Sequence, residues 1–413
     1  MQKYFPIRTA TACQLKWNWT TLYLDGGVSM TCHRTAETAL TPENFNNFHN
    51  TEVVLDDRRR MLQGLWPQKS CSYCKNLEEA GGFSDRLRHL DIPNQVPPEL
   101  DSDATALVVS PTIVEVFFNN TCNLGCLYCS PYLSSVINNE NQKFGTFIKG
   151  DLQLTKVETH HKDLTPYFWQ WFVTGFQKLK RFGALGGEPL YQKEFEKLLD
   201  MIEQYPNPDC ELYIVTNLMI GTDRLCMFID RFKKLIITKK IKKIDVTCSI
   251  DCWGPQQEYV RWGLQLHQWQ KNFEILLNNK WLYLNINQTI TGLTIKTMPE
   301  LLTKIKEWNG TRPVHQHFSI ASPGPSYFEP GILGGNQFKD DFDQILNLMP
   351  QVSDEDKTTY NYMASIASKV TKSTIDVTEV VKLLDFLDEK DRRRGTHWPT
   401  LFPWLTEYKK YVV

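Results

Sequence analysis

The sequence predicts an α/β protein whose central part is built from parallel strands joined by helices. Between residues 110 and 322, short apolar runs alternate with amphipathic stretches of helical periodicity. Strands separated by helices favour a parallel sheet with right-handed crossovers. A Pro-rich segment at residues 92–98 is typical of a linker, and the pattern becomes helical after residue 323. The predicted domains are therefore residues 1–100, 110–322 and 323–413.

Six apolar runs are predicted as the strands of this central part. They lie at residues 112–118, 181–185, 211–215, 244–250, 282–286 and 314–319. Helices are predicted between and after them, where apolar residues recur at helical spacing. They lie at residues 167–172, 194–204, 224–235, 267–277 and 298–308. In parallel sheets and barrels the ligand site lies at the carboxyl ends of the strands, so the residues that follow each run are the candidate site.

Composition narrows the classes of function. The 413 residues carry a formal net charge of −1, which gives no general attraction to nucleic acid or to an acidic membrane. The chain does not begin with a signal segment, and no apolar stretch approaches the roughly 18 residues of a membrane span. We therefore expect a soluble, cytoplasmic protein. Its eleven cysteines favour metal binding in a reducing compartment over disulfides.

Three of these cysteines form a tight loop directly after the first predicted strand. Cys122, Cys126 and Cys129 have the spacing C-x3-C-x2-C. Each thiolate can hold one iron of a [4Fe–4S] cube, which leaves the fourth iron without a protein ligand nearby. An open iron suggests a site that binds a chemically active molecule. A zinc knuckle is the alternative, but zinc needs a fourth ligand and no histidine nearby supplies one.

Polar and flexible residues follow the next strands. After the second strand, Gly186 and Gly187 let a ligand approach the backbone, and the carboxylate of Glu188 can bind an ammonium group. Each feature alone has an ordinary explanation, as a turn or as a tolerated polar residue. Their shared position at strand ends predicts one site. The members at the third, fourth and fifth strands are Thr216, Asn217, Ser249, Asp251, Arg261 and Gln288.

The cysteine loop and the strand-end residues together resemble the radical S-adenosylmethionine (SAM) enzymes, over about residues 110–320. The resemblance implies a partial (β/α)6 TIM-type barrel in which SAM chelates the open iron of the [4Fe–4S] cluster. It implies that reductive cleavage of SAM gives a 5′-deoxyadenosyl radical, which abstracts hydrogen from a substrate. A reductant such as flavodoxin or ferredoxin would supply the electron.

The resemblance also implies roles for individual residues. Gly186, Gly187 and Glu188 would hold the methionyl amino group, and Arg261 would reach the SAM carboxylate. Tyr128, just before the last cysteine of the loop, would lie near the adenine. The remaining expected SAM contacts are Thr216, Asn217, Ser249 and Asp251, toward ribose and carboxylate, and Gln288.

Four further cysteines lie in the N-terminal module, at Cys13, Cys32, Cys71 and Cys74. Four thiolates can close a second [4Fe–4S] cluster or bind structural zinc, and free thiols are a third possibility. The arrangement resembles the twitch domain, the short relative of the SPASM domain, in an N-terminal variety found partly in phage-borne proteins. The resemblance implies an auxiliary [4Fe–4S] cluster that accepts an electron or positions the substrate.

Other chemistry-bearing residues have two interpretations each. Cys252 could deliver hydrogen to a radical, or it could be a partly buried spectator. The basic runs at residues 239–243 and 392–394 could touch phosphates, although solvated faces are more usual in a chain of neutral balance. His315 and His317 share one face of the sixth strand and could act as acid–base groups or line the core.

The function that we expect is modification of a peptide or protein side chain by a radical SAM enzyme. Dehydrogenation or rearrangement of a small alcohol, sugar or nucleoside is the alternative within the enzyme class. A non-catalytic Fe–S electron carrier or scaffold is the alternative from another class, and it predicts no SAM cleavage. Neither nucleic acid nor a membrane is an expected partner.

Overall fold

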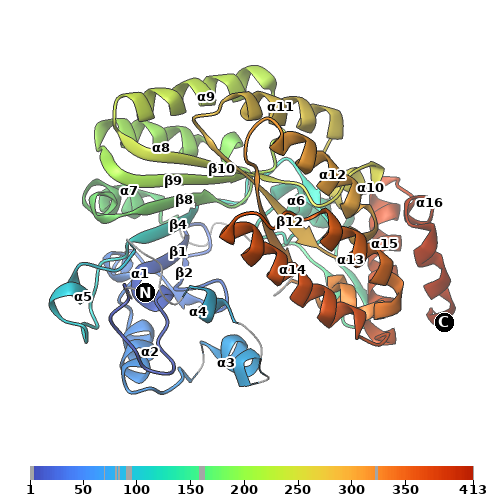
Figure 1. Ribbon diagram of the computed structural model, residues 1–413, viewed down its shortest axis with the longest axis horizontal. Helices are drawn as coiled ribbons and strands as arrows, with labels where there is room; N and C mark the ends of the chain where they lie inside the picture. Colours follow the sequence, from blue (N-terminus) through green and yellow to red (C-terminus); the bar gives the residue numbers. More distant parts are fainter. Residues whose placement is uncertain are drawn as a thin grey trace. The chain divides into compact units, whose positions relative to one another are not determined.

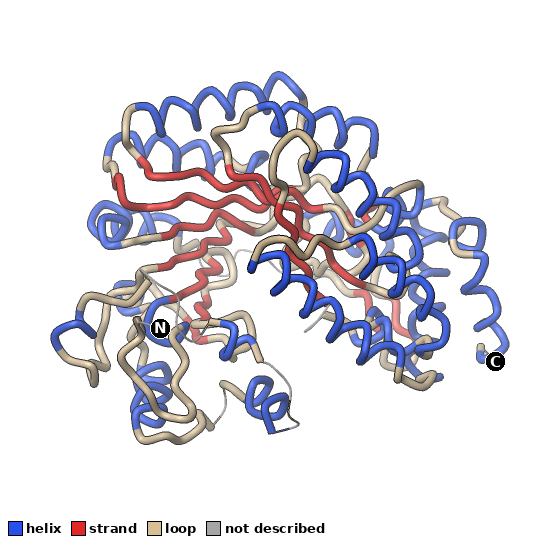
Figure 2. Tube along the Cα trace, in the orientation of Figure 1, coloured by secondary structure: helices blue, strands red, loops and turns tan. Residues whose placement is uncertain are grey.

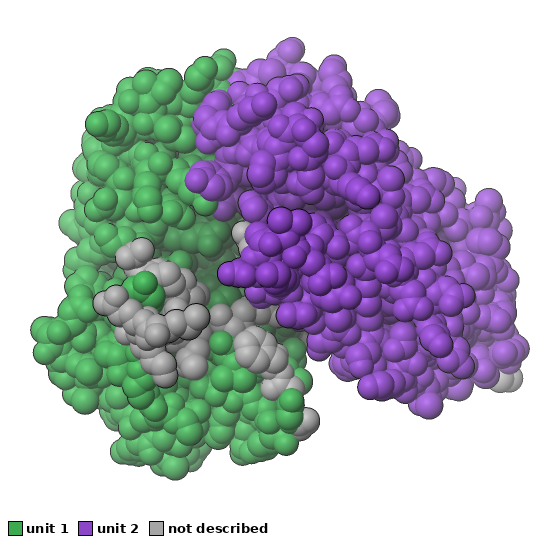
Figure 3. Space-filling view, viewed as in Figure 1, with its two compact units in different colours: residues 1–120, 158–214, 227–244 green, residues 121–157, 215–226, 245–413 purple. Residues whose placement is uncertain are grey.

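The computed structural model describes residues 4–68, 70–79, 81, 84–89, 95–157, 163–320 and 324–412. Residues 92–94 of the expected linker, together with residue 323, lie outside the described residues. The chain divides into two compact units, coloured separately in Figure 3. Unit 1 comprises residues 1–120, 158–214 and 227–244, and unit 2 comprises residues 121–157, 215–226 and 245–413. These limits differ from the three domains expected from the sequence, and that division stays a prediction.

Within the described residues the main sheet has nine strands, most of them parallel (Figure 2). In unit 1 the strand order is β9-β8-β4-β1-β2-β3. The bounds are β1 Trp19–Tyr23, β2 Val28–Met30, β3 Thr38–Ala39, β4 Ile113–Phe117, β8 Arg181–Leu185 and β9 Asn207–Thr216, the last two residues of which belong to unit 2. Strands β9, β8, β4 and β1 run parallel, and β2 and β3 continue antiparallel. The N-terminal module therefore extends the parallel sheet through β1, which the sequence pattern did not predict.

In unit 2 the strand order is β10-β12-β13, and all three strands run parallel. The bounds are β10 Ile241–Ser249, whose first residues belong to unit 1, β12 Tyr283–Ile290 and β13 His315–Ile320. Two short antiparallel ribbons lie outside this sheet. They pair β5 Gly125–Cys126 with β11 Arg261–Trp262, and β6 Phe147–Lys149 with β7 Leu152–Leu154. The first ribbon contains part of the three-cysteine loop.

Helices connect the strands and make up the C-terminal part of the chain (Figure 1). The helices of unit 1 are α1 Leu15–Asn18, α2 Glu52–Leu62, α3 Ser72–Glu79, α4 Asp85–Arg88, α5 Glu99–Ser102, α7 Thr165–Gly175 and α8 Lys193–Gln204. The helices of unit 2 are α6 Ser135–Phe144, α10 Pro255–Val260, α11 Leu266–Asn278, α12 Met298–Asn309, α13 Lys339–Leu348, α14 Asp354–Thr371, α15 Val377–Arg394 and α16 Trp398–Leu401. Helix α9 Thr222–Ile237 begins in unit 2 and ends in unit 1. No helix in the described part of the chain could span a membrane.

The six strands expected from apolar runs are all present, as β4, β8, β9, β10, β12 and β13. The five helices expected between them are present as α7, α8, α9, α11 and α12. Helix α7 has 11 residues where six were predicted, and the other four are one to four residues longer than predicted. The α/β class and the mainly parallel sheet are therefore confirmed. The partial barrel expected from the resemblance stays a prediction.

Aromatic rings fill the core of unit 1 and explain the position of α7. Phe168 and Phe172 of this helix are fully buried, and Phe172 stacks on Phe176 with ring centroids 4.4 Å apart. Phe182 of β8 meets Phe172 edge-on at 5.9 Å. Burial of one phenylalanine side chain contributes about 1.5–3 kcal/mol. The rings therefore hold α7 against β8.

The basic run at residues 392–394 is not the solvated face that we expected. Arg393 and Arg394 lie at the end of α15, and their side chains are 0% and 2% exposed. They are buried because they pair with Glu389 of the same helix and with Glu140 of α6. The expectation was right only for Arg392, whose side chain is 59% exposed.

Candidate functional site

The three-cysteine loop is shaped by hydrogen bonds within unit 2. Cys126 lies opposite Arg261 in the antiparallel ribbon of β5 and β11. At the start of the loop, the N–H of Cys122 donates to Oγ of Ser135, at 3.1 Å, where α6 begins. The hydroxyl of Ser135 in turn donates to the carbonyl of Cys122 at 3.1 Å. The loop therefore has a defined backbone that orients its three sulfurs.

The three thiols of the loop interact with one another. Cys126 and Cys129 form no disulfide in the structure. Burial is the main cause that raises the pKa of Cys129, and the neighbouring Cys126 and Cys122 raise it further. Burial also raises the pKa of Cys126, against the opposing charge of Arg261. Since metals bind thiolates, loading the loop with a metal group must release these protons.

In the described part of the chain, no three His, Cys, Asp or Glu side chains converge to hold a single metal ion. Structural zinc requires such convergence, because its four ligands bind one ion. A [4Fe–4S] cube takes one thiolate on each iron, so its ligands surround a larger group. The metal ligands expected at both groups of cysteines stay a prediction.

Asp251, just after β10, organises the residues around the loop. Its buried carboxylate accepts two hydrogen bonds of 2.9 Å from the guanidinium of Arg261, one at each oxygen. Oδ2 also accepts from the hydroxyl of Tyr128 at 2.6 Å, and Oδ1 accepts from the N–H of Thr289 at 2.8 Å. A carboxylate has about four lone-pair sites, so these donors fill it. For Asp251 to contact SAM as expected, one of these hydrogen bonds would have to break.

Arg261 connects this carboxylate to the cysteine loop. Burial lowers its pKa, but the charge of Asp251 outweighs burial and holds the pKa well above its usual value. Its remaining Nη1 lies 3.9 Å from the sulfur of Cys126. Burial raises the pKa of Tyr128, so the phenol keeps its proton and remains a donor to Asp251. The structure thus brings Tyr128, Asp251 and Arg261 together beside one cysteine of the loop.

Gln257 of α10 is a residue of this region that the sequence did not indicate. Its Oε1 accepts from the N–H groups of Asp251 and Cys252, at 3.0 and 2.9 Å, and fixes the turn after β10. No local signal marks it, because a glutamine on a helix is common. Cys252 is fully buried, its thiol donates to the same Oε1 at 3.5 Å, and burial raises its pKa. This setting fits the spectator interpretation, and hydrogen delivery by Cys252 stays a prediction.

Thr216 and Asn217 fold the end of β9 into a tight turn. Oγ1 of Thr216 accepts from the N–H of Leu218 at 2.9 Å. Leu218 has φ 59°, a left-handed conformation that costs a non-glycine residue about 1–2 kcal/mol. The side-chain amide of Asn217 donates to Oδ1 of Asn123 at 2.9 Å and lies 3.8 Å from the sulfur of Cys122. The turn therefore places Asn217 beside the cysteine loop.

Ser249 and Gln288 are buried in neighbouring strands of unit 2. In the register of β10 and β12, Ser249 lies opposite Asn287. Gln288 donates to the carbonyl of Asp251 at 3.4 Å, and its Oε1 has no hydrogen-bond partner among the described residues. An unpaired buried polar atom costs about 1–3 kcal/mol. Gln288, one of the expected SAM contacts, therefore has an acceptor atom, Oε1, that is available to a ligand.

Gly186, Gly187 and Glu188 follow β8 in unit 1, in a turn that requires glycine. Gly186 has φ +77°, and a Cβ there would stand 2.2 Å from the ring of Phe117. Gly187 has φ +55°. Oε1 of the buried Glu188 accepts from the N–H of Leu190 at 3.2 Å and caps the short 3-10 helix that follows. The turn itself explains the glycines, and the expected hold on the amino group of SAM stays a prediction.

The four N-terminal cysteines come close to one another in unit 1. Burial raises the pKa of Cys13, and Cys32 and Cys71 raise it further. Burial raises the pKa of Cys32 to about 12, and Cys74 adds to that effect. Cys13 and Cys71, which are 58 positions apart in the sequence, are therefore close enough to interact electrostatically.

A cavity of about 160 Å³ in unit 1 is lined in part by Lys16, Asp57 and Ser70. Nζ of Lys16 donates to Oδ2 of Asp57 at 2.5 Å, and the two side chains are 2% and 6% exposed. The charge of Lys16 also lowers the pKa of Cys13, Cys32 and Cys71, so the cavity lies near three of the four thiols. A cavity of about 150 Å³ can hold benzene. This one can therefore admit a single side chain or a small molecule.

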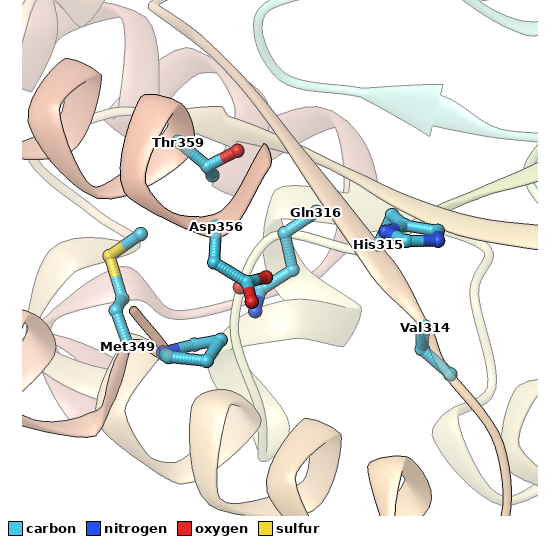
Figure 4. A pocket seen from close by; sticks show the side chains of 7 residues that line it. Val314, His315, Gln316, Met349, Asp356 and Thr359 are labelled. Atoms are coloured by element: carbon cyan, nitrogen blue, oxygen red, sulfur yellow. The ribbon is translucent and has the colours of Figure 1, made fainter. Parts of the chain in front are cut away.

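A second cavity, in unit 2, has a volume of about 10 Å³ and is shown in Figure 4. Residues of β13 and α14 line it, among them His315, Gln316, Asp356 and Thr359. This volume suits one water molecule. His317 is exposed on the same strand. The structure therefore gives no support to the acid–base role considered for these histidines.

Comparison with known proteins gives distant likenesses. No protein-family model and no curated protein matches the chain. Among solved structures, anSMEcpe with bound AdoMet has 17% identity and a TM-score of 0.37, over 65% of this chain and 62% of that chain. SuiB of Streptococcus suis bound to S-adenosylmethionine has 13% identity and a TM-score of 0.36, over 90% and 68%. SuiB bound to precursor peptide SuiA has 13% identity and a TM-score of 0.37, over 94% and 74%.

The chain spans about 62% of the length of the anSMEcpe chain that it resembles. TM-scores of this size do not decide a fold or a function. We therefore base the proposed function on the residues of this chain.

Proposed function

We propose that this chain is a radical SAM enzyme that cleaves SAM reductively with a [4Fe–4S] cluster on Cys122, Cys126 and Cys129. The observation that carries the proposal is the buried network in which Asp251 holds Arg261 next to the sulfur of Cys126. Burying an ion destabilises a protein by several kcal/mol, so a loop with only a structural role would not favour a buried arginine such as Arg261. Hydrogen-bond donors around metal-bound thiolates are typical of sites that tune a metal group.

Each residue of this network has a task in the proposed mechanism. The three thiolates would hold the cluster and leave one iron open for SAM. Arg261 stabilises the thiolate of Cys126, and Asp251 keeps Arg261 oriented. When bound, the cluster and SAM would supply the chemistry, which is one-electron reductive cleavage of SAM to methionine and a hydrogen-abstracting 5′-deoxyadenosyl radical. An external reductant such as flavodoxin or ferredoxin supplies the electron.

We assign an auxiliary [4Fe–4S] cluster to the four N-terminal cysteines, Cys13, Cys32, Cys71 and Cys74. Their mutual electrostatic effects support this assignment. When bound, this cluster would supply an acceptor for the second electron of a two-electron oxidation of the substrate, and the accompanying proton would pass to water.

A peptide or protein side chain is the substrate class that we propose. The cavity lined by Lys16 and Asp57 has room for about one side chain. Its wall carries the buried pair of Lys16 and Asp57, which can bind the polar groups of a peptide. A small alcohol, sugar or nucleoside is the alternative substrate.

Anaerobic reconstitution with iron and sulfide tests the metal assignment. We expect about eight irons per chain, since each cube holds four, and no bound zinc. About four irons with one zinc would remove the auxiliary cluster from the proposal. A chain that takes up no iron would overturn it.

Deuterium transfer tests the substrate class. Reconstituted protein is incubated with SAM, dithionite and peptides deuterated at their side chains, and deuterium is measured in 5′-deoxyadenosine. Transfer from a peptide is the expected result, and transfer from a deuterated alcohol or nucleoside alone would replace the peptide. Iron uptake without any SAM cleavage would favour a non-catalytic Fe–S carrier.

A further inference from the structure

Gln192, the residue directly before α8, is buried although its side chain is polar. The residue is 2% exposed and occupies the N-cap position of the helix. Ser, Thr, Asp and Asn are preferred at this position, because their side chains accept hydrogen bonds from the first N–H groups of the helix. Gln192 makes no such capping hydrogen bond. The helix therefore does not explain why this amide is buried.

The side-chain amide of Gln192 joins two segments of unit 1. Its Nε2 donates to the carbonyl of Gly186 at 3.0 Å and to the carbonyl of Asn119 at 3.1 Å. Gly186 begins the turn after β8, and Asn119 lies two residues after the end of β4, the strand that pairs with β8. A side-chain amide has two N–H donors, so these carbonyls can use both. One buried side chain thus ties the turn to the end of the neighbouring strand.

Two further contacts hold the same turn and the same strand end together. The backbone of Gly186 lies so close to Phe117, the last residue of β4, that a Cβ would stand 2.2 Å from its ring. The side-chain amide of Asn119 donates to Oε2 of Glu194, in the first turn of α8, at 3.1 Å. The turn after β8 is therefore fixed against the end of β4 by packing as well as by hydrogen bonds.

A turn that is already fixed can bind a ligand more tightly than a mobile one. A mobile backbone has to be ordered when the ligand binds, and this ordering weakens the binding. The turn of Gly186, Gly187 and Glu188 is the segment that we expect to hold the methionyl amino group of SAM. Without the two N–H donors of Gln192, the carbonyls of Gly186 and Asn119 lose hydrogen bonds, which favours a different position of the turn.

We propose that Gln192 is a positioning residue that fixes the turn of Gly186, Gly187 and Glu188 in the position that binds the methionyl amino group of SAM. This inference rests on the proposed function and adds a residue to its SAM site. Gln192 acts through the turn and does not itself contact SAM. The effect concerns the amino group alone, so a ligand that lacks this group does not depend on Gln192.

Gln192→Met in the reconstituted full-length protein tests the inference, because methionine has a similar length and no N–H donor. The matched control is Gln177→Met, since Gln177 is exposed and its Nε2 donates to the carbonyl of Tyr205 at 3.2 Å. The dissociation constant of SAM is measured from the change that SAM causes in the EPR signal of the cluster. An analogue of SAM with hydrogen in place of the amino group is measured by competition. We expect Gln192→Met to weaken the binding of SAM about tenfold, and to leave the analogue unchanged, while Gln177→Met matches the wild type.

Other outcomes would overturn the inference. If Gln192→Met takes up iron and binds SAM as tightly as the wild type, the inference is wrong while the proposed function stands. If SAM and the analogue are weakened by the same factor, Gln192 does not act through the amino group, and the inference fails as well. A wild-type chain that takes up no iron would overturn the proposed function, and this inference with it.

A second variant keeps the test valid if Gln192→Met does not fold, as judged by circular dichroism. Gln192→Asn keeps the amide on a side chain that is one methylene shorter, so it cannot reach both carbonyls. Weaker binding of SAM with unchanged binding of the analogue would support the inference. Wild-type binding of SAM by Gln192→Asn would overturn it.

Discussion

Asp251 is the residue on which the candidate site depends most. Donors from three chain segments meet at its carboxylate: Tyr128 of the loop, Arg261 of β11 and Thr289 of β12. The sequence predicted Asp251 and Arg261 as site residues from their place after a strand, and Tyr128 from the family resemblance. It could not show that they bind one another, because Tyr128 and Asp251 are 123 positions apart. The hydrogen bond from the backbone N–H of Thr289 could not be predicted, because every residue except proline has a backbone N–H.

Asp251→Asn should destabilise the protein by about 3 kcal/mol, because it leaves the buried Arg261 without a counter-charge. Urea denaturation of the metal-free protein measures the change. The control is Glu307→Gln, which breaks an exposed ion pair with Lys304 of 3.0 Å and should cost at most about 1 kcal/mol. If both substitutions lowered the free energy of unfolding by the same small amount, the ion pair of Asp251 with Arg261 would not stabilise the protein.

Gly186→Ala should destabilise the protein by about 1–3 kcal/mol, because the position combines φ +77° with a Cβ contact of 2.2 Å to Phe117. The matched control is Gly26→Ala, whose Cβ would meet its nearest atom at 3.7 Å. The midpoint of thermal unfolding measures both. A Gly186→Ala protein as stable as the control would contradict the strained turn.

Local patterns predicted individual elements well and their long-range partners poorly. The run of residues 112–118 is apolar enough to be recognised as β4 by itself. Strand β1 was not predicted because it pairs with β4, about 90 residues later in the chain. A periodic pattern within one segment does not reveal such a distant partner. The burial of Arg393 and Arg394 was missed for the same reason, since Glu140 lies some 250 positions before them. A basic run is buried rather than exposed to solvent where the fold places a carboxylate against it.

The burial of Lys390 near the end of α15 predicts a pH dependence of stability. Burial is the main cause that lowers the pKa of Lys390 to about 8, and Arg394 lowers it further. Unfolded lysine has a pKa of about 10.4. Between these values the unfolded chain binds more protons than the folded one, so the free energy of unfolding rises with pH.

Relative to Lys390→Met, the wild type should gain about 1–3 kcal/mol of stability between about pH 7.5 and pH 10. Urea denaturation at several pH values measures this difference in the metal-free protein. Taking the difference cancels the titration of groups common to both proteins. A difference that stays constant with pH would mean that Lys390 keeps its ordinary pKa.

At the scale of the whole molecule, each compact unit holds one group of cysteines. Unit 2 holds Cys122, Cys126 and Cys129, and unit 1 holds Cys13, Cys32, Cys71 and Cys74. The sequence found both groups from spacing alone. It could not find the division into units, because strands of the N-terminal module and of the central part share one sheet. Two separate groups of thiols predict two separable metal sites.

Cys74→Ser should lower the iron content from about eight to about four per chain, because it removes a ligand of the auxiliary cluster only. Release of 5′-deoxyadenosine should persist, while oxidised product should be lost. The control is Cys226→Ser, which changes an exposed free thiol. Unchanged iron content in Cys74→Ser would remove the N-terminal cysteines from the metal sites.

The most direct test of the proposed enzyme is release of 5′-deoxyadenosine from SAM by the reconstituted, dithionite-reduced protein. The account predicts release by the wild type and by Cys226→Ser, and none by Cys126→Ser, whose loop lacks one thiolate. Equal release by Cys126→Ser, or no release from a wild-type protein that contains its full complement of iron, would contradict it.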